Sequence, residues 1–272
     1  MEIYCLQVNH LENPLGYEMN RTVFSWKVRG AKGKKQTEAR IRVSTSENLE
    51  NGTNIVDTGF LPELFSTGAE VKIELAPRTR YYWDVTVRTD CGEEEKSEVQ
   101  WFETGKMEEP WKSEWISCDN GEARHPIFKK KIVRTGQVRK ARLYICGLGL
   151  YEAYYNGKRI GDEYLAPYCN DYNEWVQYQT YDVTKMLDEE RVLFVILGNG
   201  WYKGRFGFDT SPDARYYGNE WKLIAELRVT YADGREEIFG TDKTWIVERS
   251  NFIFSDIYDG EQRDDTLPAL PE

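Results

Sequence analysis

YYWDVTVR, at residues 81–88, alternates regularly between two kinds of side chain. The odd-numbered positions are large and apolar: Tyr81, Trp83, Val85 and Val87. The even-numbered positions are mostly polar: Tyr82, Asp84, Thr86 and Arg88. Successive side chains of a β-strand point to opposite faces, so this stretch predicts a half-buried antiparallel strand. The Asp90-Cys91-Gly92 sequence that follows predicts the turn that ends it.

Further short strands are predicted throughout the first part of the chain. They lie at residues 23–28, 39–44, 55–58, 71–75 and 100–104, with turn residues between them. About seven short strands separated by frequent turns are typical of an immunoglobulin or fibronectin type III sandwich. We therefore expect residues 1–106 to form an all-β, fibronectin type III-like sandwich.

A second domain is predicted after the polar stretch TGKMEEP at residues 104–110, which contains Gly and Pro and has no periodicity. Within residues 107–266, Asn156-Gly157 lies between apolar flanks and favours a type I′ hairpin. Residues 223–229 alternate like a strand, and the only helical pattern spans residues 183–190. These features predict a jelly-roll β-sandwich, antiparallel like the first domain. The final residues, LPALPE at 267–272, are typical of a linker.

The composition excludes several classes of function. The 272 residues carry a net charge of −10, whereas a nucleic-acid partner requires a basic face. The five cysteines are widely spaced and the histidines number two, so we expect neither a disulfide framework nor a zinc site. No apolar run approaches the ~20 residues that span a membrane. The first residues lack the pattern of a signal peptide, which leaves the cytoplasm, the periplasm and secretion as open alternatives.

Several stretches together resemble the N-terminal region of bacterial α-L-rhamnosidases. In the first predicted domain they are LENPLG at 11–16, FSW at 24–26, RYYW at 80–83 and WFETG at 101–105. In the second they are YNGKRIGD at 155–162, QYQTYDVT at 177–184, GNGWYKGR at 198–205 and SDIYDGE at 255–261. Each stretch is moderately specific, but their joint order covers nearly the whole chain.

The resemblance implies a fibronectin-like domain followed by a jelly roll, which in some family members is a calcium-dependent rhamnose-binding module. The family's catalytic carboxylates belong to a large helical barrel later in the chain, and the helices of such a barrel are not predicted here. The parent protein would then be an inverting hydrolase of terminal α-L-rhamnosides. This sequence has PYC at 167–169, where Pro-Gly-Trp is common in the family.

Two polar segments of the second domain form the candidate sugar site. NDYNEW at 170–175 and YGNEW at 217–221 place amide and carboxylate oxygens beside aromatic rings. Aromatic faces cover the C–H side of a sugar, and oxygen ligands suit Ca²⁺. The predicted sugar-binding residues are Asn170, Asp171, Asn173, Trp175, Asn219 and Trp221. The predicted calcium ligands are Asn170, Asp171 and Asn219. The alternative is a pair of solvated turns, since Asn, Asp and Gly are ordinary turn residues.

Three other groups of residues have a functional and a structural interpretation. The glycine-rich stretch 198–205 favours a tight corner with Trp201 in the core over a binding loop. Asp256 and Glu261, with Asp259, could act as the carboxylate pair of a glycosidase, but acidic residues close to a linker are commonly solvated. The cysteines are expected to be inert thiols, because no local base accompanies them.

The sequence therefore predicts a non-catalytic accessory fragment of a glycoside hydrolase. Its expected partners are rhamnose-containing glycans and the catalytic helical barrel of the parent chain, with calcium as a cofactor. Two rival hypotheses stay open: a purely structural or protein-binding module, and a lectin-like glycosidase that uses Asp256 and Glu261.

Overall fold

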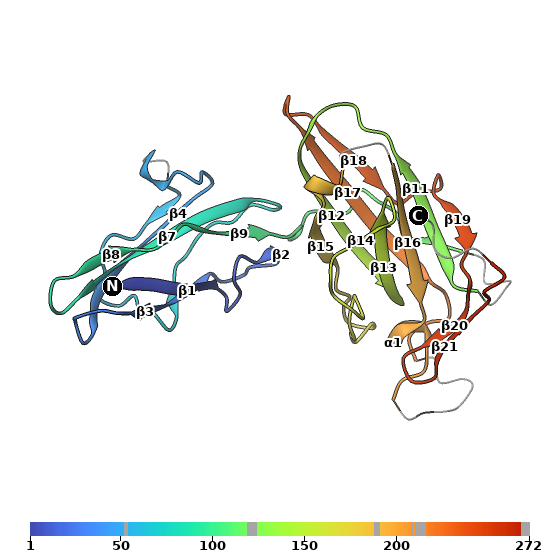
Figure 1. The fold of residues 1–272 in the computed structure, drawn as a ribbon, viewed down its shortest axis with the longest axis horizontal. Helices are drawn as coiled ribbons and strands as arrows, with labels where there is room; N and C mark the ends of the chain where they lie inside the picture. Colours follow the sequence, from blue (N-terminus) through green and yellow to red (C-terminus); the bar gives the residue numbers. More distant parts are fainter. Residues whose placement is uncertain (52–53, 119–123, 188–190, 208, 210–215, 268–272) are drawn as a thin grey trace. The chain divides into compact units, whose positions relative to one another are not determined.

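The computed structural model describes residues 1–272 except 52–53, 119–123, 188–190, 208, 210–215 and 268–272 (Figure 1). Among the described residues, the only helical segments are α1 (Gly200–Lys203) and the 3₁₀ turns η1 (Leu49–Asn51) and η2 (Thr184–Met186). The prediction of an all-β class is thereby confirmed. The chain divides into two compact units, Met1–Pro110 and Trp111–Glu272, a few residues beyond the predicted boundary after Lys106. The predicted linker lies, apart from Leu267, outside the described residues.

Unit 1 is a sandwich of two sheets. One sheet has the order β1 (Glu2–Val8), β3 (Val23–Arg29) and β6 (Ala69–Glu70). The other has the order β2 (Leu15–Tyr17), β9 (Gln100–Thr104), β7 (Arg80–Thr89), β4 (Gln36–Ser44) and β5 (Val56–Asp57), with β8 (Glu94–Lys96) paired to β7. The strand predicted at residues 71–75 is wrong. Val71, Ile73 and Leu75 do pack on the core, which explains the alternation, but the segment has no strand conformation.

The core of unit 1 is built around the predicted face of β7. Tyr81, Trp83, Val85 and Val87 are all buried. The ring of Trp83 lies 4.6 Å from that of Phe24 on the facing sheet, and Tyr81 stacks on Phe102 at 5.1 Å. Tilted and offset aromatic pairs of this kind stabilise a core beyond the area that they bury.

The second face of β7 is covered by ion pairs, so the strand is more than half-buried. Asp84 is 1% exposed and accepts two hydrogen bonds from Arg42 of β4, at 3.0 and 2.5 Å. Arg42 also donates to Glu50 at 2.8 Å, and Lys96 of β8 reaches the same carboxylate at 2.9 Å. Buried charges must be paired, and this network supplies the partners.

One pairing differs from the antiparallel arrangement expected from the sequence. β2 runs parallel to β9, with Leu15 opposite Glu103. The chain enters this position through Asn13, whose Oδ1 accepts from the Trp101 amide at 3.1 Å, and through Pro14, whose carbonyl accepts from the Glu103 amide at 2.8 Å. These local hydrogen bonds place β2 at the sheet edge, where a short parallel strand is tolerated.

Unit 2 is also a two-sheet sandwich. Its first sheet has the order β10 (Ile116–Ser117), β17 (Lys222–Tyr231), β12 (Val138–Leu148) and β15 (Gln179–Asp182), with β18 (Glu236–Gly240) paired to β17. The second has the order β14 (Lys158–Ile160), β13 (Leu150–Tyr155), β16 (Arg191–Gly198), β11 (Pro126–Ile132) and β19 (Ile246–Arg249). The inner faces share one core that includes Leu143, Leu197 and Leu223. The predicted jelly-roll class is confirmed.

The turn predicted at Asn156-Gly157 agrees with the structure of unit 2, whereas the helical pattern at residues 183–190 does not form an α-helix within its described residues. Asn156 and Gly157 have φ angles of 52° and 72° and join β13 to β14, with Tyr155 opposite Lys158. Positive φ at both central residues is the type I′ geometry that favours the hairpin twist. The segment 183–190 forms only the 3₁₀ turn η2 within its described residues.

A separate hairpin of β20 (Phe252–Asp256) and β21 (Gly260–Arg263) lies beside α1 at one end of unit 2 (Figure 1). Arg205, just after α1, donates to Asp259 at 2.7 and 2.9 Å, and its guanidinium lies 4.7 Å from the Tyr258 ring centroid. The Trp201 indole donates to the Tyr258 hydroxyl at 3.3 Å. Trp201 is therefore half-buried against the hairpin instead of filling the core.

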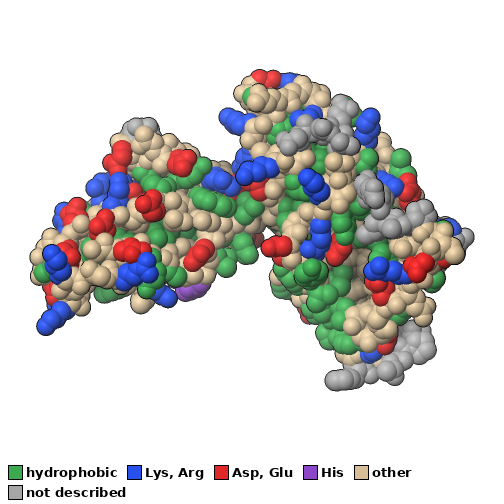
Figure 2. Space-filling view, viewed as in Figure 1, with side chains coloured by type: hydrophobic (Ala, Val, Ile, Leu, Met, Phe, Trp, Pro, Cys, Tyr) green, Lys and Arg blue, Asp and Glu red, His purple; other side chains and the backbone are tan. Residues whose placement is uncertain are grey.

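Charged side chains of both signs are scattered over the face seen in Figure 2. This mixture agrees with the many exposed ion pairs, among them Arg21–Glu70 and Arg235–Asp233. Among the described residues, no helix is long and apolar enough to cross a membrane.

Replacing Asp84 by Ala should destabilise unit 1 strongly, because it removes the buried carboxylate that pairs with the Arg42 guanidinium. The expected loss is about 3 kcal/mol of unfolding free energy, measured by chemical denaturation of the whole chain. Glu70→Ala removes an exposed partner of Arg21 and serves as the matched control, with no resolvable shift of the midpoint. Equal effects of the two substitutions would contradict the assignment of Asp84 as a buried structural charge.

Candidate functional site

Two loops that are far apart in the sequence meet beside α1. One connects β14 to β15 and contains residues 170–175; the other precedes β17 and contains residues 216–221. The Tyr172 ring lies 5.0 Å from the Tyr217 ring and 5.3 Å from the Tyr202 ring of α1. The structure therefore brings together the two segments that the sequence analysis assigned to one site.

A hollow of about 320 Å³ lies at this junction and is lined by Asn173, Phe206, Tyr216 and Tyr217. Phe206 and Tyr216 are exposed, so the hollow has open aromatic walls and one amide. Sequence reasoning identified Asn173 and the segment that contains Tyr217, but it missed Phe206 and Tyr216. The adjacent pair Tyr216-Tyr217 just before Gly218-Asn219 was the signal available for them.

Asn170 and Asp171 occupy different environments at the start of the first loop. Asn170 is 4% exposed, and its Oδ1 is buried without a hydrogen-bond partner among the described residues. Asp171 is exposed, and its carbonyl accepts from the amides of Glu174 and Trp175 at 2.9 and 3.0 Å. An unsatisfied buried acceptor costs about 1–3 kcal/mol, so the Asn170 oxygen is suited to a donor or a cation.

The two predicted tryptophan walls are placed differently. Trp175 is 53% exposed, so its ring is accessible to a ligand. Trp221 is 4% exposed and packs in the core, with its ring 5.0 Å from that of His125. Trp221 lies two residues before Leu223 of β17, so both side chains point to the inner face of the sheet, which explains why Trp221 is buried. Asn219 is exposed on the second loop, two residues beyond Tyr217.

The residues predicted as calcium ligands supply one carboxylate, on Asp171, and two amides, on Asn170 and Asn219. Among the described residues, no three His, Cys, Asp or Glu side chains gather closely enough to hold a metal. The orphaned Asn170 oxygen nevertheless fits a hard cation, which takes carbonyl oxygens readily. A Ca²⁺ ion held by these three side chains would take its remaining ligands from backbone, water or a bound sugar, because among the three only Asp171 supplies a carboxylate.

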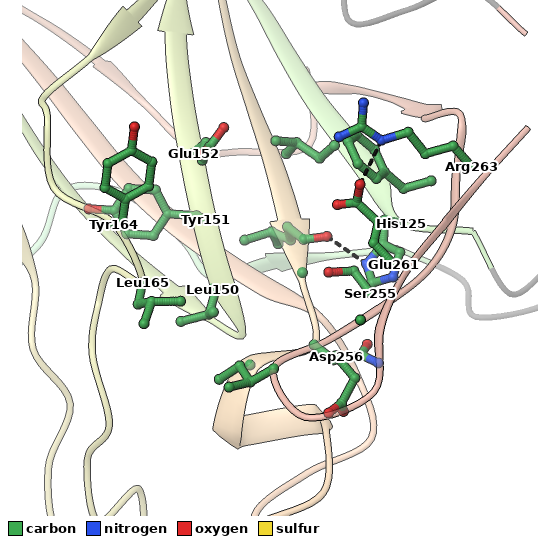
Figure 3. A pocket seen from close by; sticks show the side chains of 18 residues that line it. His125, Leu150, Tyr151, Glu152, Tyr164, Leu165, Ser255, Asp256, Glu261 and Arg263 are labelled. Atoms are coloured by element: carbon green, nitrogen blue, oxygen red, sulfur yellow. Dashed lines mark hydrogen bonds and ion pairs between the residues drawn. The ribbon is translucent and has the colours of Figure 1, made fainter. Parts of the chain in front are cut away.

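A larger hollow of about 420 Å³ has different lining residues, among them Gly200 of α1 (Figure 3). One wall is formed by β13 and the loop after β14, with Leu150, Tyr151, Glu152, Tyr164 and Leu165. The opposite wall is the β20–β21 hairpin, with Ser255, Asp256, Glu261 and Arg263. His125 and the end of β16 also line the hollow, and His125 lies beside Ser255 and Glu261 (Figure 3).

The carboxylates of the glycosidase hypothesis both line this larger hollow, but they do not face one another. Glu261 accepts from Arg263 at 2.6 Å and points along the hairpin, whereas Asp256 points the opposite way (Figure 3). The Asp256 side chain lies against Gly204 at the end of α1. The third acid, Asp259, is held by Arg205, whose hydrogen bonds lower the pKa of that carboxyl. A catalytic acid needs a raised pKa and a facing partner, and this arrangement supplies neither at Asp259.

The thiols offer no nucleophile at the site. Cys146 is buried in β12, and burial raises the pKa of its thiol to about 12. The pKa of the exposed Cys169 is also raised, by partial desolvation. Both thiols therefore stay protonated near neutral pH, and a protonated thiol is a poor nucleophile.

Comparison with known proteins identifies both units. Residues 3–108 match a family model described as the Rha78A-like, N-terminal immunoglobulin domain. Residues 136–269 match one described as the alpha-L-rhamnosidase N-terminal domain. An alpha-L-rhamnosidase of Formosa agariphila is 31% identical over 291 residues, which cover 94% of this chain and 30% of that protein. The chain thus spans under a third of the length of this relative.

Solved structures agree with the sequence matches. The alpha-L-rhamnosidase of Dictyoglumus thermophilum superposes with a TM-score of 0.86 at 32% identity, over 96% of this chain and 31% of that one. The Streptomyces avermitilis alpha-L-rhamnosidase, solved in complex with L-rhamnose, also gives 0.86, at 20% identity over 97% of this chain and 42% of that one. At 20% identity, the match to the Streptomyces avermitilis structure shows that the fold is shared.

Tyr172→Ala should loosen the junction of the two loops, because it removes the ring that contacts both Tyr217 and Tyr202. We expect amide hydrogen exchange at Gly218 and Asn219 to accelerate on the order of tenfold, with the sheets unaffected. Tyr164→Ala, which removes a 74% exposed ring elsewhere in unit 2, is the control. Unchanged exchange in Tyr172→Ala would show that the tyrosine contacts do not hold the loops together.

Proposed function

The chain belongs to the N-terminal region of the α-L-rhamnosidase family, and on that premise we propose that it is a non-catalytic accessory part that binds a rhamnose-type sugar. The observation that carries the proposal is the junction of the two loops beside α1. It combines an aromatic-walled hollow, the exposed Trp175 ring and the unsatisfied oxygen of Asn170. Aromatic faces with a few polar groups are the usual composition of a shallow sugar site.

In this proposal Asp171, Asn170 and Asn219 hold a calcium ion, and Asn173 and Trp175 contact the sugar. The calcium ion would coordinate hydroxyl oxygens of the sugar. The Asp171 carboxylate provides the only negative charge of this ligand set, so it should dominate the affinity for the ion. Trp221 belongs to the core and positions β17 behind the second loop.

Hydrolysis is assigned to a part of the parent protein outside this chain. The chain covers 30% of the Formosa agariphila relative and 31% of the Dictyoglumus thermophilum structure. Asp256 and Glu261 point away from each other (Figure 3), so this carboxylate pair favours an accessory role of the chain over a catalytic one. Attachment to a catalytic domain is therefore the second role that we propose for these two units.

Calorimetric titration of the whole chain with L-rhamnose tests the sugar site. We expect a Kd on the order of micromolar to millimolar with calcium present, as for single sugar-binding modules. Asp171→Ala should abolish the heat signal. Asp162→Ala, which removes an exposed carboxylate of the same unit, should leave it intact. Binding that survives Asp171→Ala would assign the sugar to another surface.

Removing calcium with a chelator should weaken L-rhamnose binding at least as much as Asp171→Ala does, because both remove the same link to the sugar. Calcium added back should restore binding to the unmodified chain and fail to restore it in Asp171→Ala. Full binding in the chelator would show that the loops hold sugar without a metal.

The purified chain should not release product from an aryl α-L-rhamnoside. Turnover that disappears in Glu261→Gln, with Glu248→Gln as the surface control, would overturn the accessory assignment. It would instead support the glycosidase hypothesis based on Asp256 and Glu261.

A further inference from the structure

The larger hollow has one apolar side that suits the C–H face of a sugar. Leu150, Leu165 and Ile196 lie beside the Tyr151 and Tyr164 rings. Tyr164 is 74% exposed, and the Arg159 guanidinium lies 4.6 Å from the centroid of its ring. The volume of about 420 Å³ falls in the range of small-ligand sites, which is roughly 300–1,000 Å³.

The opposite side of the hollow presents hydrogen-bond acceptors. His125 is 2% exposed, and its Nδ1 lies 2.9 Å from the Leu197 carbonyl oxygen, so Nδ1 carries the proton. Burial lowers the pKa of His125 and keeps the ring neutral. Nε2 is then an acceptor, and no described residue donates a hydrogen bond to it. Asn199 adds an Oδ1 that is buried without a partner among the described residues and makes no cap for α1.

The charges of the lining favour a neutral ligand. Glu261 is paired with Arg263, and Glu152 lies 3.5 Å from the Arg159 guanidinium. These ion pairs neutralise the two carboxylates, so the lining does not require a cationic ligand. Asp256 remains as a negative charge that would repel a ligand carboxylate or sulfate. A ligand that donates several hydrogen bonds without carrying charge matches this lining best, and a polyhydroxylated ring has that property.

We infer that the larger hollow is a second glycan site, which takes one neutral pyranose unit through the acceptors of His125 and Asn199 and the ring of Tyr164. The inference rests on the proposed sugar-binding function and extends it to a different surface. The two hollows share no lining residue. Gly200 of α1 lines the larger hollow, whereas Tyr202 of α1 contacts the loop at Tyr172.

Titration of the ¹⁵N-labelled chain with L-rhamnose separates the two sites by NMR. The amides of Gly198, Gly200 and Gly260 report on the larger hollow, and the amide of Gly218 reports on the loop junction. Both sets should shift as the sugar is raised to about 100 mM, since single sugar contacts are of millimolar strength. D-Glucuronate at the same concentration should leave the larger hollow unshifted.

Substitutions assign each response to its site. Tyr164→Ala and Asn199→Ala should each weaken the Gly198 and Gly260 response about tenfold and leave the Gly218 response unchanged. Asp171→Ala should do the reverse. Tyr17→Ala, which removes an exposed tyrosine of unit 1, is the matched control and should change neither. The remaining amide signals report whether each variant is folded.

The outcomes distinguish the two proposals. A Gly218 response without one at Gly198 and Gly260 overturns the second site and leaves the proposed function standing. A response only in the larger hollow supports the second site and removes the loop site. No response in either set overturns both. Equal shifts with D-glucuronate, or shifts with methylammonium in place of L-rhamnose, overturn the assignment to a neutral sugar.

Discussion

Each unit depends on burying the inner faces of two sheets against each other. The aromatic pairs Phe24–Trp83 and Tyr81–Phe102 occupy this interface in unit 1, and the apolar faces of β12, β16 and β17 occupy it in unit 2. Because strand side chains alternate with a period of two, a slip of one residue would turn each of these faces outward. The buried faces therefore hold the register of the strands and, through it, the positions at which the loops leave the sheets.

The polar interactions of the sheets are consequences of that burial. When strand β7 lies in the middle of its sheet, its second face is covered as well, and the charges on it need partners. Arg42 and Asp84 meet that need in unit 1, and Glu226 and Arg228, 2.5 Å apart, meet it on β17 of unit 2. Asn199, whose Oδ1 is buried without a partner among the described residues, lines the larger hollow.

The short helix α1 links the two hollows of unit 2. Its Tyr202 packs on Tyr172 of the first loop, and the segment that follows is held to the β20–β21 hairpin by Arg205 and Asp259. Gly200 has a φ of 56° and lies so close to Leu150 that a side chain there would collide with it. The glycines of the stretch 198–205 therefore let the chain turn tightly, as the sequence pattern favoured, although Trp201 does not fill the core and Asn199 lines the larger hollow.

The sequence by itself determined the fold class and the local turns, because both follow from short-range patterns. The alternation in residues 81–88 placed β7, and Asn156-Gly157 placed the hairpin of β13 and β14 through its tolerance of positive φ. The order of motifs was enough to indicate the family. The same reasoning erred at residues 71–75, where alternating side chains reach the core without a strand partner.

Only the tertiary structure decided which polar and aromatic residues share a surface. Asn173 and Tyr217 are separated by dozens of residues, and no local pattern states that their loops meet. The inward parity of Trp221 was visible in the sequence, but its burial depended on the sheet that covers it. The opposed directions of Asp256 and Glu261 followed from the hairpin and its contact with α1. Long-range packing sets these relations, since it depends on how two sheets stack and on which loop ends they bring together.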